Sequence, residues 1–195
     1  MKTLPISQIQ YIPPETADSE LTELFDEIQR ITDTPVVNNM WLILGNSICV
    51  LTGSWQLFFN LYLQGSLPMT LKGLILFSVA AAHHCQYCGA VHEVACRFLG
   101  VNEASLEAIV QDLGRLTPER TRKIIQFAVR CADEPLTLKE EDYAQIRDFG
   151  ITDVEIVEIV SLAAMGSYFD ILADALKLEV DSYLRELLPG EQLVR

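Results

Sequence analysis

Two cysteines three positions apart are the residues of this chain best suited to chemistry. Cys85 and Cys88 enclose Gln86 and Tyr87, and His92 follows four positions after the second cysteine. Side chains at these spacings share one face of a helix, so the two sulfurs can form a disulfide and the imidazole can reach the second sulfur. Such a pair can open and close reversibly. The spacing therefore predicts a dithiol/disulfide redox centre.

The start of a helix would favour the reactive form of these thiols. Apolar residues after the pair keep helical spacing until Gly100, which is typical of a left-handed helix end. The pair is therefore predicted to lie at the helix N-terminus, where free N–H groups and the helix dipole stabilise a thiolate. His92 can pair with the thiolate of Cys88 or move its proton. We expect Cys88 to attack and Cys85 to resolve.

The elements that position the pair are predicted to be helices. An apolar helix that starts after Pro68 leads directly to His83, His84 and Cys85. A first amphipathic helix covers Ser19–Ile31, and the uncharged residues 34–71 predict two buried helices with a break near Thr52-Gly53-Ser54. Because no strand-like alternation of useful length appears, the predicted fold class is all-α.

Later in the chain, the same pattern of a helix end followed by a helix start occurs twice. Gly100 and Gly150 are each followed by a capping residue, Asn102 and Thr152 respectively. Two capping boxes are predicted by spacing, Thr152 with Glu155 and Thr137 with Glu140.

The segment from Cys85 to His92 resembles the CxxCxxxH signature of the AhpD-like alkylhydroperoxidase family, within the carboxymuconolactone decarboxylase-like superfamily. The resemblance is clearest over residues 68–100, the predicted redox-motif helices. It implies one all-helical AhpD-like domain over residues 1–195, with an irregular arm at residues 1–18. It also implies that peroxide oxidises Cys88 to a sulfenic acid, that Cys85 resolves it as a disulfide, and that His92 joins a proton relay.

The chain departs from the family at one position of that relay. The family carries a glutamate twelve positions before the first cysteine, where this chain has Gly73. Possible replacements are His83, His84 and Glu93. Glu93 points about 100° away from its neighbour His92 around a helix, whereas either histidine can act as a base near neutral pH.

The composition of the chain limits the kinds of partner and the cellular location that we expect. The formal net charge of -13 repels nucleic acid. Met1–Pro14 lacks the pattern of a secretory signal, and five cysteines are too few for a disulfide scaffold, so a cytoplasmic location is expected. Met40–Leu63 is long enough to cross a bilayer, but Gly and polar residues interrupt it and no basic cluster flanks it. We therefore expect no membrane partner.

The expected function is a peroxidase-related dithiol oxidoreductase that needs no metal and no organic cofactor. Its partners would be a hydroperoxide and a protein or small-molecule dithiol reductant, and the resemblance suggests a homo-oligomer, a trimer or hexamer. Two alternatives stay open. One is a decarboxylase of the carboxymuconolactone type, and the other is a non-enzymatic helical oligomer with a zinc ion held by the cysteines and His83 or His84.

Overall fold

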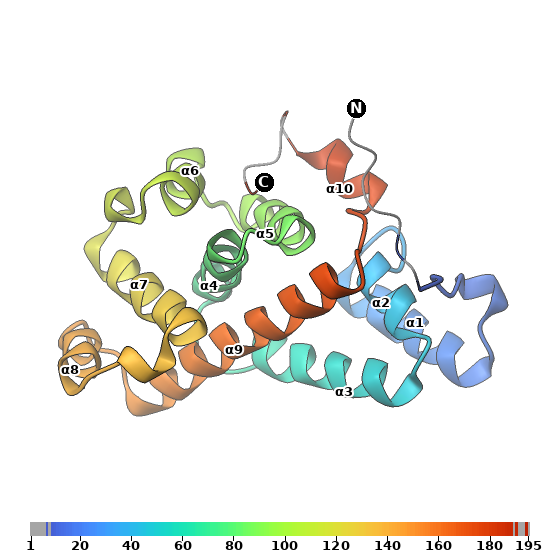
Figure 1. Cartoon of the computed structure of the whole chain (residues 1–195), viewed down its shortest axis with the longest axis horizontal. Coiled ribbons are helices and arrows are strands. Elements are labelled where there is room, and N and C mark those ends of the chain that lie inside the picture. The colour runs from blue at the N-terminus through green and yellow to red at the C-terminus, as the bar shows by residue number, and fades with distance from the viewer. Residues whose placement is uncertain (1–6, 8, 189, 191–193, 195) are drawn as a thin grey trace.

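The computed structural model describes residues 7, 9–188, 190 and 194, and every regular element in them is helical. The predicted all-α class is confirmed (Figure 1). The predicted N-terminal arm is irregular where it is described, apart from a short 3-10 helix at Pro14–Thr16; residues 1–6 and 8 lie outside the described residues. The α-helices of this part of the chain are α1 Ser19–Thr32, α2 Asn39–Leu44, α3 Ile48–Phe58, α4 Met69–Ala82, α5 Gln86–Phe98, α6 Glu103–Gln111, α7 Glu119–Asp133, α8 Glu140–Asp148, α9 Asp153–Ala175 and α10 Ser182–Leu187.

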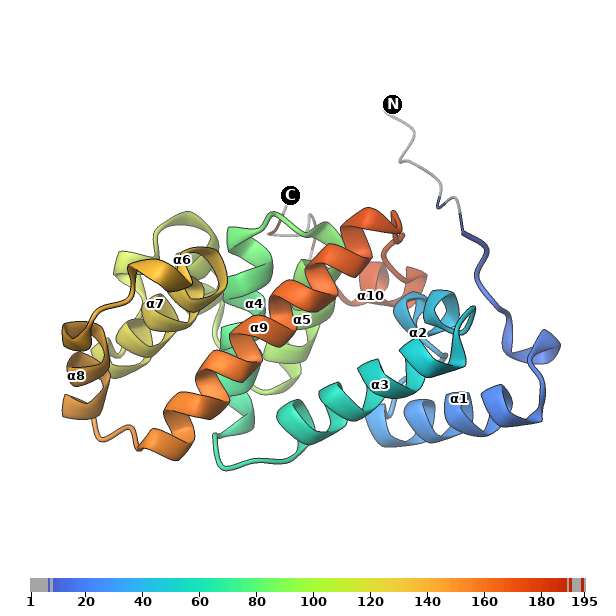
Figure 2. The same ribbon diagram turned by 60° about the horizontal axis from the view of Figure 1, so that its bottom comes forward.

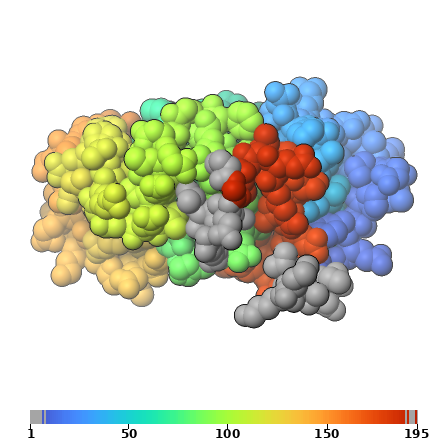
Figure 3. All heavy atoms as spheres, turned by 90° about the horizontal axis from the view of Figure 1, so that it is seen from above, coloured from blue at the N-terminus to red at the C-terminus, as the bar shows by residue number. Residues whose placement is uncertain are grey.

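Helix α4 forms the centre of the fold. It packs against α5, α7 and α9, and every residue from Leu71 to Ala80 is buried. A helix that is buried on all sides belongs in a core rather than on a surface. The N-terminal helices α1–α3 lie at one end of the elongated molecule, and α6–α8 lie at the other (Figures 2 and 3).

Helix α9 crosses α4 at close range. A Cβ atom at Gly166 would lie only 3.0 Å from Cγ1 of Val79, so the absence of a side chain permits the contact. One turn further along both helices come Asp170 of α9 and His83 at the end of α4. The close packing at Gly166 therefore sets these two polar residues at the same level.

The predicted break at Thr52-Gly53-Ser54 was wrong. These residues lie inside α3, and the chain breaks earlier, between Leu44 and Ile48. A Cβ at Gly53 would meet nothing within 4 Å, so the glycine only removes a surface side chain at a cost of about 1 kcal/mol. Burial of Leu51 and Trp55 on either side offsets that cost.

The capping predictions had mixed outcomes. Thr152 and Glu155 form the predicted capping box at the start of α9. The box predicted for Thr137 and Glu140 is wrong, because α8 starts at Glu140 with Lys139 as its N-cap, two residues later than that spacing requires. There the backbone N–H of Lys139 donates to Oδ2 of Asp142 at 2.8 Å, while Thr137 donates back to the carbonyl of Glu134.

Helix α9 is also the one helix of the described residues that is long and apolar enough to cross a membrane, by length and composition. Half of its most apolar window is buried inside the fold. Packing against α4, α5 and α7 accounts for that composition. The stretch Met40–Leu63 is instead divided between α2, α3 and a π-helical turn at Phe59–Leu63.

Candidate redox site

The turn between α4 and α5 places the cysteine pair. His84 adopts a left-handed conformation with φ of 56°, and the N–H groups of His84 and Cys85 donate to the carbonyls of Ala81 and Ala80. This pattern is a Schellman motif, which ends a helix and reverses the chain. Cys85 thereby becomes the N-cap of α5 and Cys88 lies in its first turn, as predicted from the sequence.

The structure brings both sulfurs close to a carboxylate. The Sγ atoms of Cys85 and Cys88 and a carboxylate oxygen of Asp170 all lie within 4.8 Å of one another, and all three residues are buried. Cys85 has no exposed surface and Cys88 retains 4%, so the second cysteine is the more accessible one. This small cluster is the chemical centre of the site.

Asp170 was missed in the sequence analysis. It stands in α9, 85 positions after Cys85, and no local pattern connects the two residues. A signal was nevertheless present, because Asp170 is the only charged residue between Glu158 and Asp174. A single acid in a long apolar helix is costly to bury without a partner. It could therefore have been marked as a functional candidate.

His83 joins this carboxylate to a second one. Its Nδ1 lies 2.8 Å from Oδ2 of Asp170, and its Nε2 lies 2.9 Å from Oδ1 of Asp133, the last residue of α7. The exposed fraction rises along the chain of side chains, from 3% for Asp170 to 26% for His83 and 38% for Asp133. The three residues connect the buried sulfurs with solvent.

The surroundings of Cys88 disfavour its thiolate. Its pKa is raised well above that of an ordinary thiol, first by the hydrogen bond with Cys85, then by burial, and then by the negative charges of Cys85 and Asp170. These effects act against the helix-start stabilisation that the sequence predicted. Cys88 therefore needs a partner that accepts its proton.

Asp170 has the properties of such a partner. Burial raises the pKa of its carboxyl, although hydrogen bonds with Cys88 and His83 act in the opposite direction. A carboxyl with a raised pKa accepts a proton more readily than an ordinary aspartate. Asp170 can thus exchange a proton with the sulfurs.

His92 is placed differently from the cluster. It is buried in α5, and burial lowers the pKa of its ring to about 4, so the ring is neutral at pH 7. Its nitrogens are not part of the group of atoms around Asp170, and the ring has no hydrogen-bond partner within the described part of the chain. It supplies no positive charge to Cys88 at neutral pH, and its role in a relay stays a prediction.

The other predicted relay residues divide into two kinds. His83 contacts the site through Asp170, whereas His84 is exposed to solvent. Glu93 is buried, and its Oε1 binds Nη2 of Arg97 at 2.8 Å, one turn further along α5. At Gly73, a Cβ would lie 3.3 Å from both Cys96 Sγ and Leu99 Cδ1, in a closely packed part of the α4–α5 interface.

Tyr87, between the two cysteines, is a packing residue. Its buried hydroxyl donates to Oδ2 of Asp181 and accepts from the N–H of Met40, both at 3.0 Å. Asp181 also accepts from the N–H of Asn39 at 2.8 Å. Tyr87 therefore fixes the first turn of α5 to the start of α2 and to the segment before α10.

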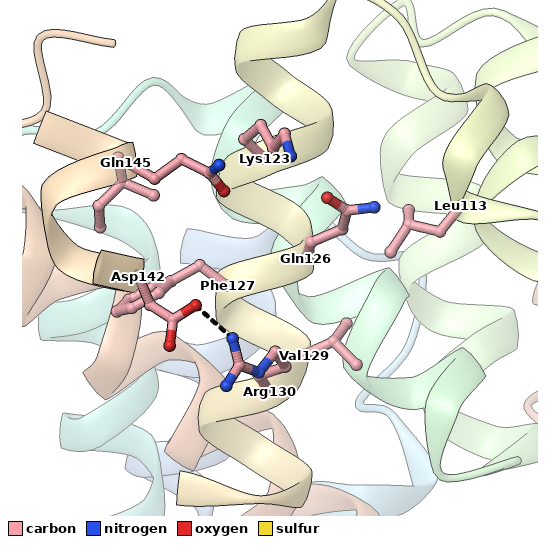
Figure 4. Close-up of a pocket in the computed structure, with 9 residues that line it drawn as sticks. Leu113, Lys123, Gln126, Phe127, Val129, Arg130, Asp142 and Gln145 are labelled. Atoms are coloured by element: carbon pink, nitrogen blue, oxygen red, sulfur yellow. Dashed lines mark hydrogen bonds and ion pairs between the residues drawn. The ribbon is translucent and has the colours of Figure 1, made fainter. Parts of the chain in front are cut away.

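Two hollows on the surface lie apart from the sulfurs. One of about 370 Å³ lies between α7, α8 and Leu113, where Arg130 pairs with Asp142 (Figure 4). The other, about 630 Å³, is lined by Pro35–Val37, Asn39 and the start of α10. Neither is lined by Cys85, Cys88 or Asp170.

The fold and the site define an all-helical protein with a buried dithiol at a helix start. Residues 51–114 match the carboxymuconolactone decarboxylase family, a segment that includes both cysteines. That segment resembles the family, and the fold of the described chain is similar to AhpD-like structures. No curated protein matches the sequence significantly.

Three solved structures illustrate the likeness. The AhpD core of an uncharacterized peroxidase-related protein from Ralstonia eutropha is 19% identical, with a TM-score of 0.84 over 93% of this chain and 96% of that one. A peroxidase-related protein from Silicibacter is 20% identical, with a TM-score of 0.83 over 94% and 97%. The debrominase Bmp8, as a C82A variant with 2,3,4-tribromopyrrole, is 16% identical, with a TM-score of 0.78 over 95% and 97%. At these identities the likeness concerns the fold.

Proposed function

We propose that this protein is a dithiol oxidoreductase that reduces hydroperoxides through a cycle of Cys85 and Cys88. The observation that carries the proposal is the buried cluster of two thiols and one carboxylate, all within 4.8 Å at the start of α5. Two sulfurs at this distance can form a disulfide after a small movement, and the carboxylate can exchange their protons. The peroxidase-related names of two structural neighbours agree with this chemistry.

The cycle balances without a metal or an organic cofactor. The Cys88 thiolate attacks one peroxide oxygen, so an S–O bond forms, the O–O bond breaks, and the leaving oxygen takes a proton to give an alcohol. Cys85 then attacks the sulfenic sulfur, so the S–S bond forms and the departing hydroxide takes the Cys85 proton as water. A dithiol of another molecule reduces the disulfide. We assign the attack to Cys88 because it retains some exposure while Cys85 has none.

A thiol titration tests the proposal. The chain has five cysteines, of which Cys49 is exposed, so Cys49→Ser is the background for all variants. One equivalent of an organic hydroperoxide should remove two thiols and the mass of two hydrogens. Peptide mapping should place the disulfide between Cys85 and Cys88. Intact thiols after this treatment would refute the proposed function.

Single cysteine variants separate the two roles. Cys88→Ser should not react with the hydroperoxide, whereas Cys85→Ser should accumulate a sulfenic acid on Cys88 that dimedone traps. Cys131→Ser is the matched control, because Cys131 is partly buried in α7 and should leave the reaction unchanged. A sulfenic acid that forms on Cys85 in the Cys88→Ser variant would reverse the assigned roles.

The same titration should also be carried out with a brominated aromatic compound as the electron acceptor. The structure of Bmp8, a debrominase with a bound tribromopyrrole, shares this fold over 95% of the chain. The same dithiol could reduce a carbon–bromine bond, since two thiols and one aryl bromide give a disulfide, the arene and hydrogen bromide. Bromide release that exceeds peroxide reduction would favour a halogenated aromatic substrate over a hydroperoxide.

A further inference from the structure

The group of His83, Asp170 and Asp133 must hold a proton of its own. Both ring nitrogens of His83 lie within hydrogen-bond distance of a carboxylate oxygen, 2.8 Å from Asp170 and 2.9 Å from Asp133. Each of these bonds needs a hydrogen. A neutral imidazole brings one, so either the ring is protonated or one carboxyl is. Two carboxylates and one imidazole therefore share an extra proton next to the sulfurs.

Asp170 is the member of this group that faces the cysteines. Its Oδ2 binds His83, while its Oδ1 is buried with no hydrogen-bond partner in the described residues. A carboxylate oxygen of the same residue lies within 4.8 Å of both sulfurs. An unpaired buried carboxylate oxygen is costly, so a group that exchanges a proton with it is expected nearby. The thiols are such groups.

We propose that Asp170 is a catalytic proton shuttle for the dithiol cycle and that His83 is the positioning residue that holds it in place, with Asp133 as the outer end of the path. The proposal rests on the proposed function, since it concerns the same reaction. It places the proton relay on α9, α4 and α7 rather than at position 73 and His92.

The shuttle completes each step of the cycle. Asp170 takes the proton of Cys88 as the thiolate attacks the peroxide, and gives it to the leaving oxygen as the O–O bond breaks. In the second step it takes the proton of Cys85 and gives it to the departing hydroxide. The net reaction is one hydroperoxide and two thiols to one disulfide, one alcohol and one water. The titratable groups that meet at this point are the two thiols of α5, Asp170 of α9, His83, and Asp133 of α7.

Asp170→Asn should change two reaction rates of Cys88 in opposite directions. The variant keeps the shape of the side chain but loses its negative charge. In the wild type that charge raises the pKa of Cys88, so the pKa should fall in the variant. Alkylation of Cys88 by iodoacetamide, whose leaving iodide needs no proton, should become faster at pH 7. Oxidation by a hydroperoxide, whose leaving oxygen needs one, should become slower by on the order of 100-fold. Asp174→Asn, one turn away on the exposed side of α9, should change neither rate.

His83→Gln tests the positioning role. The amide can still bind Asp170 but cannot carry the shared proton, so the pH profile of peroxide oxidation should flatten while circular dichroism stays unchanged. Asp133→Asn should have a smaller effect in the same direction, and Glu134→Gln, its exposed neighbour, should have none. His84→Gln separates the two adjacent histidines, and a loss of rate there equal to that of His83→Gln would overturn the assignment.

The outcomes also separate this proposal from the proposed function. If Asp170→Asn slows alkylation and oxidation equally, or changes neither, the shuttle is overturned while the peroxidase cycle stands. If the wild type does not react with peroxide, the proposed peroxidase function is refuted, but the shuttle proposal is not. The shuttle is then tested with hydroxyethyl disulfide, whose leaving thiolate also takes a proton. An unchanged exchange rate in Asp170→Asn would overturn it there as well.

Discussion

Tyr87→Phe should destabilise the protein without removing its redox chemistry. The hydroxyl of Tyr87 binds two groups at 3.0 Å, the carboxylate of Asp181 and the N–H of Met40. In the variant the carboxylate of Asp181 still accepts a hydrogen bond from the N–H of Asn39, but the N–H of Met40 is left buried and unpaired. A hydrogen bond to a charged group contributes about 1.5–3 kcal/mol, and an unsatisfied buried donor costs about 1–3 kcal/mol. Because the two terms overlap, we expect a loss of about 3 kcal/mol in the free energy of unfolding.

The measurement is urea unfolding followed by tryptophan fluorescence. Trp41 follows Met40 in the chain and is buried, so it reports the same region. A loss of this size should lower the melting temperature by about 6–12 °C in a chain of this length. Tyr183→Phe is the control, since its partly buried hydroxyl makes one bond, to Oδ1 of Asn38 at 3.1 Å, and should cost about 1 kcal/mol.

The thiol titration must accompany the unfolding curves. Because Tyr87 acts through α2 and the segment before α10, the folded variant should still lose two thiols on treatment with peroxide. A variant as stable as the wild type but unreactive would show that the hydroxyl contacts substrate, and the packing argument would then be wrong.

Two further predictions concern the helices around the site. His92→Phe removes a ring whose pKa falls from 6.5 to about 4 on folding. The unfolded chain binds that proton first as the pH drops, so the wild type should lose about 3 kcal/mol of stability between pH 7 and pH 4 that the variant keeps; parallel urea midpoints across this range would contradict the buried neutral ring. Gly166→Ala should cost about 1–3 kcal/mol, because the added Cβ comes within 3.0 Å of Val79. Adding Val79→Ala should recover part of this loss, and additive losses would show that the two residues do not meet.

The local part of the site could be predicted from the sequence. Cys85 and Cys88 lie at the start of α5 because a helix that stops at Gly100 and begins after a turn at His84 can only present them there. Spacing and capping signals depend on neighbouring residues, which a sequence shows directly. The same reasoning located the start of α4 at Pro68 and the capping box of α9.

The contacts of the site that come from distant helices could not be predicted from the sequence. The contact between Asp170 and the cysteines depends on how α9 lies across α4, and periodicity shows that a helix has an apolar face without showing which helix covers it. The close approach at Gly166 decides this, and a glycine within a helix was not informative by itself. Gly53, in contrast, was given too much weight. It was interpreted as a helix break, although it lies on an exposed face of α3.

The reversal of the expected charge at Cys88 has the same origin. A helix start alone favours a thiolate, but the sequence analysis could not include a buried carboxylate from a distant helix. Once Asp170 lies beside both sulfurs, a resting thiolate would face a second negative charge in a buried setting. Keeping the proton on sulfur avoids that repulsion, and in the proposed cycle the carboxylate then accepts this proton when an oxidant arrives.

In the proposed cycle, the position of the carboxylate makes an acidic residue at position 73 unnecessary. At position 73 a side chain would enter the tight contact with Cys96 and Leu99, two turns of α5 beyond the sulfurs. The junction of α4, α7 and α9 offers instead a histidine with a carboxylate on each side, and its outer carboxylate is in contact with solvent. A proton that leaves a thiol at this point has a continuous set of acceptors to the surface. On the α5 side, the neighbouring ring of His92 is buried and neutral. The proton route therefore follows the polar contacts between helices rather than the spacing within one motif.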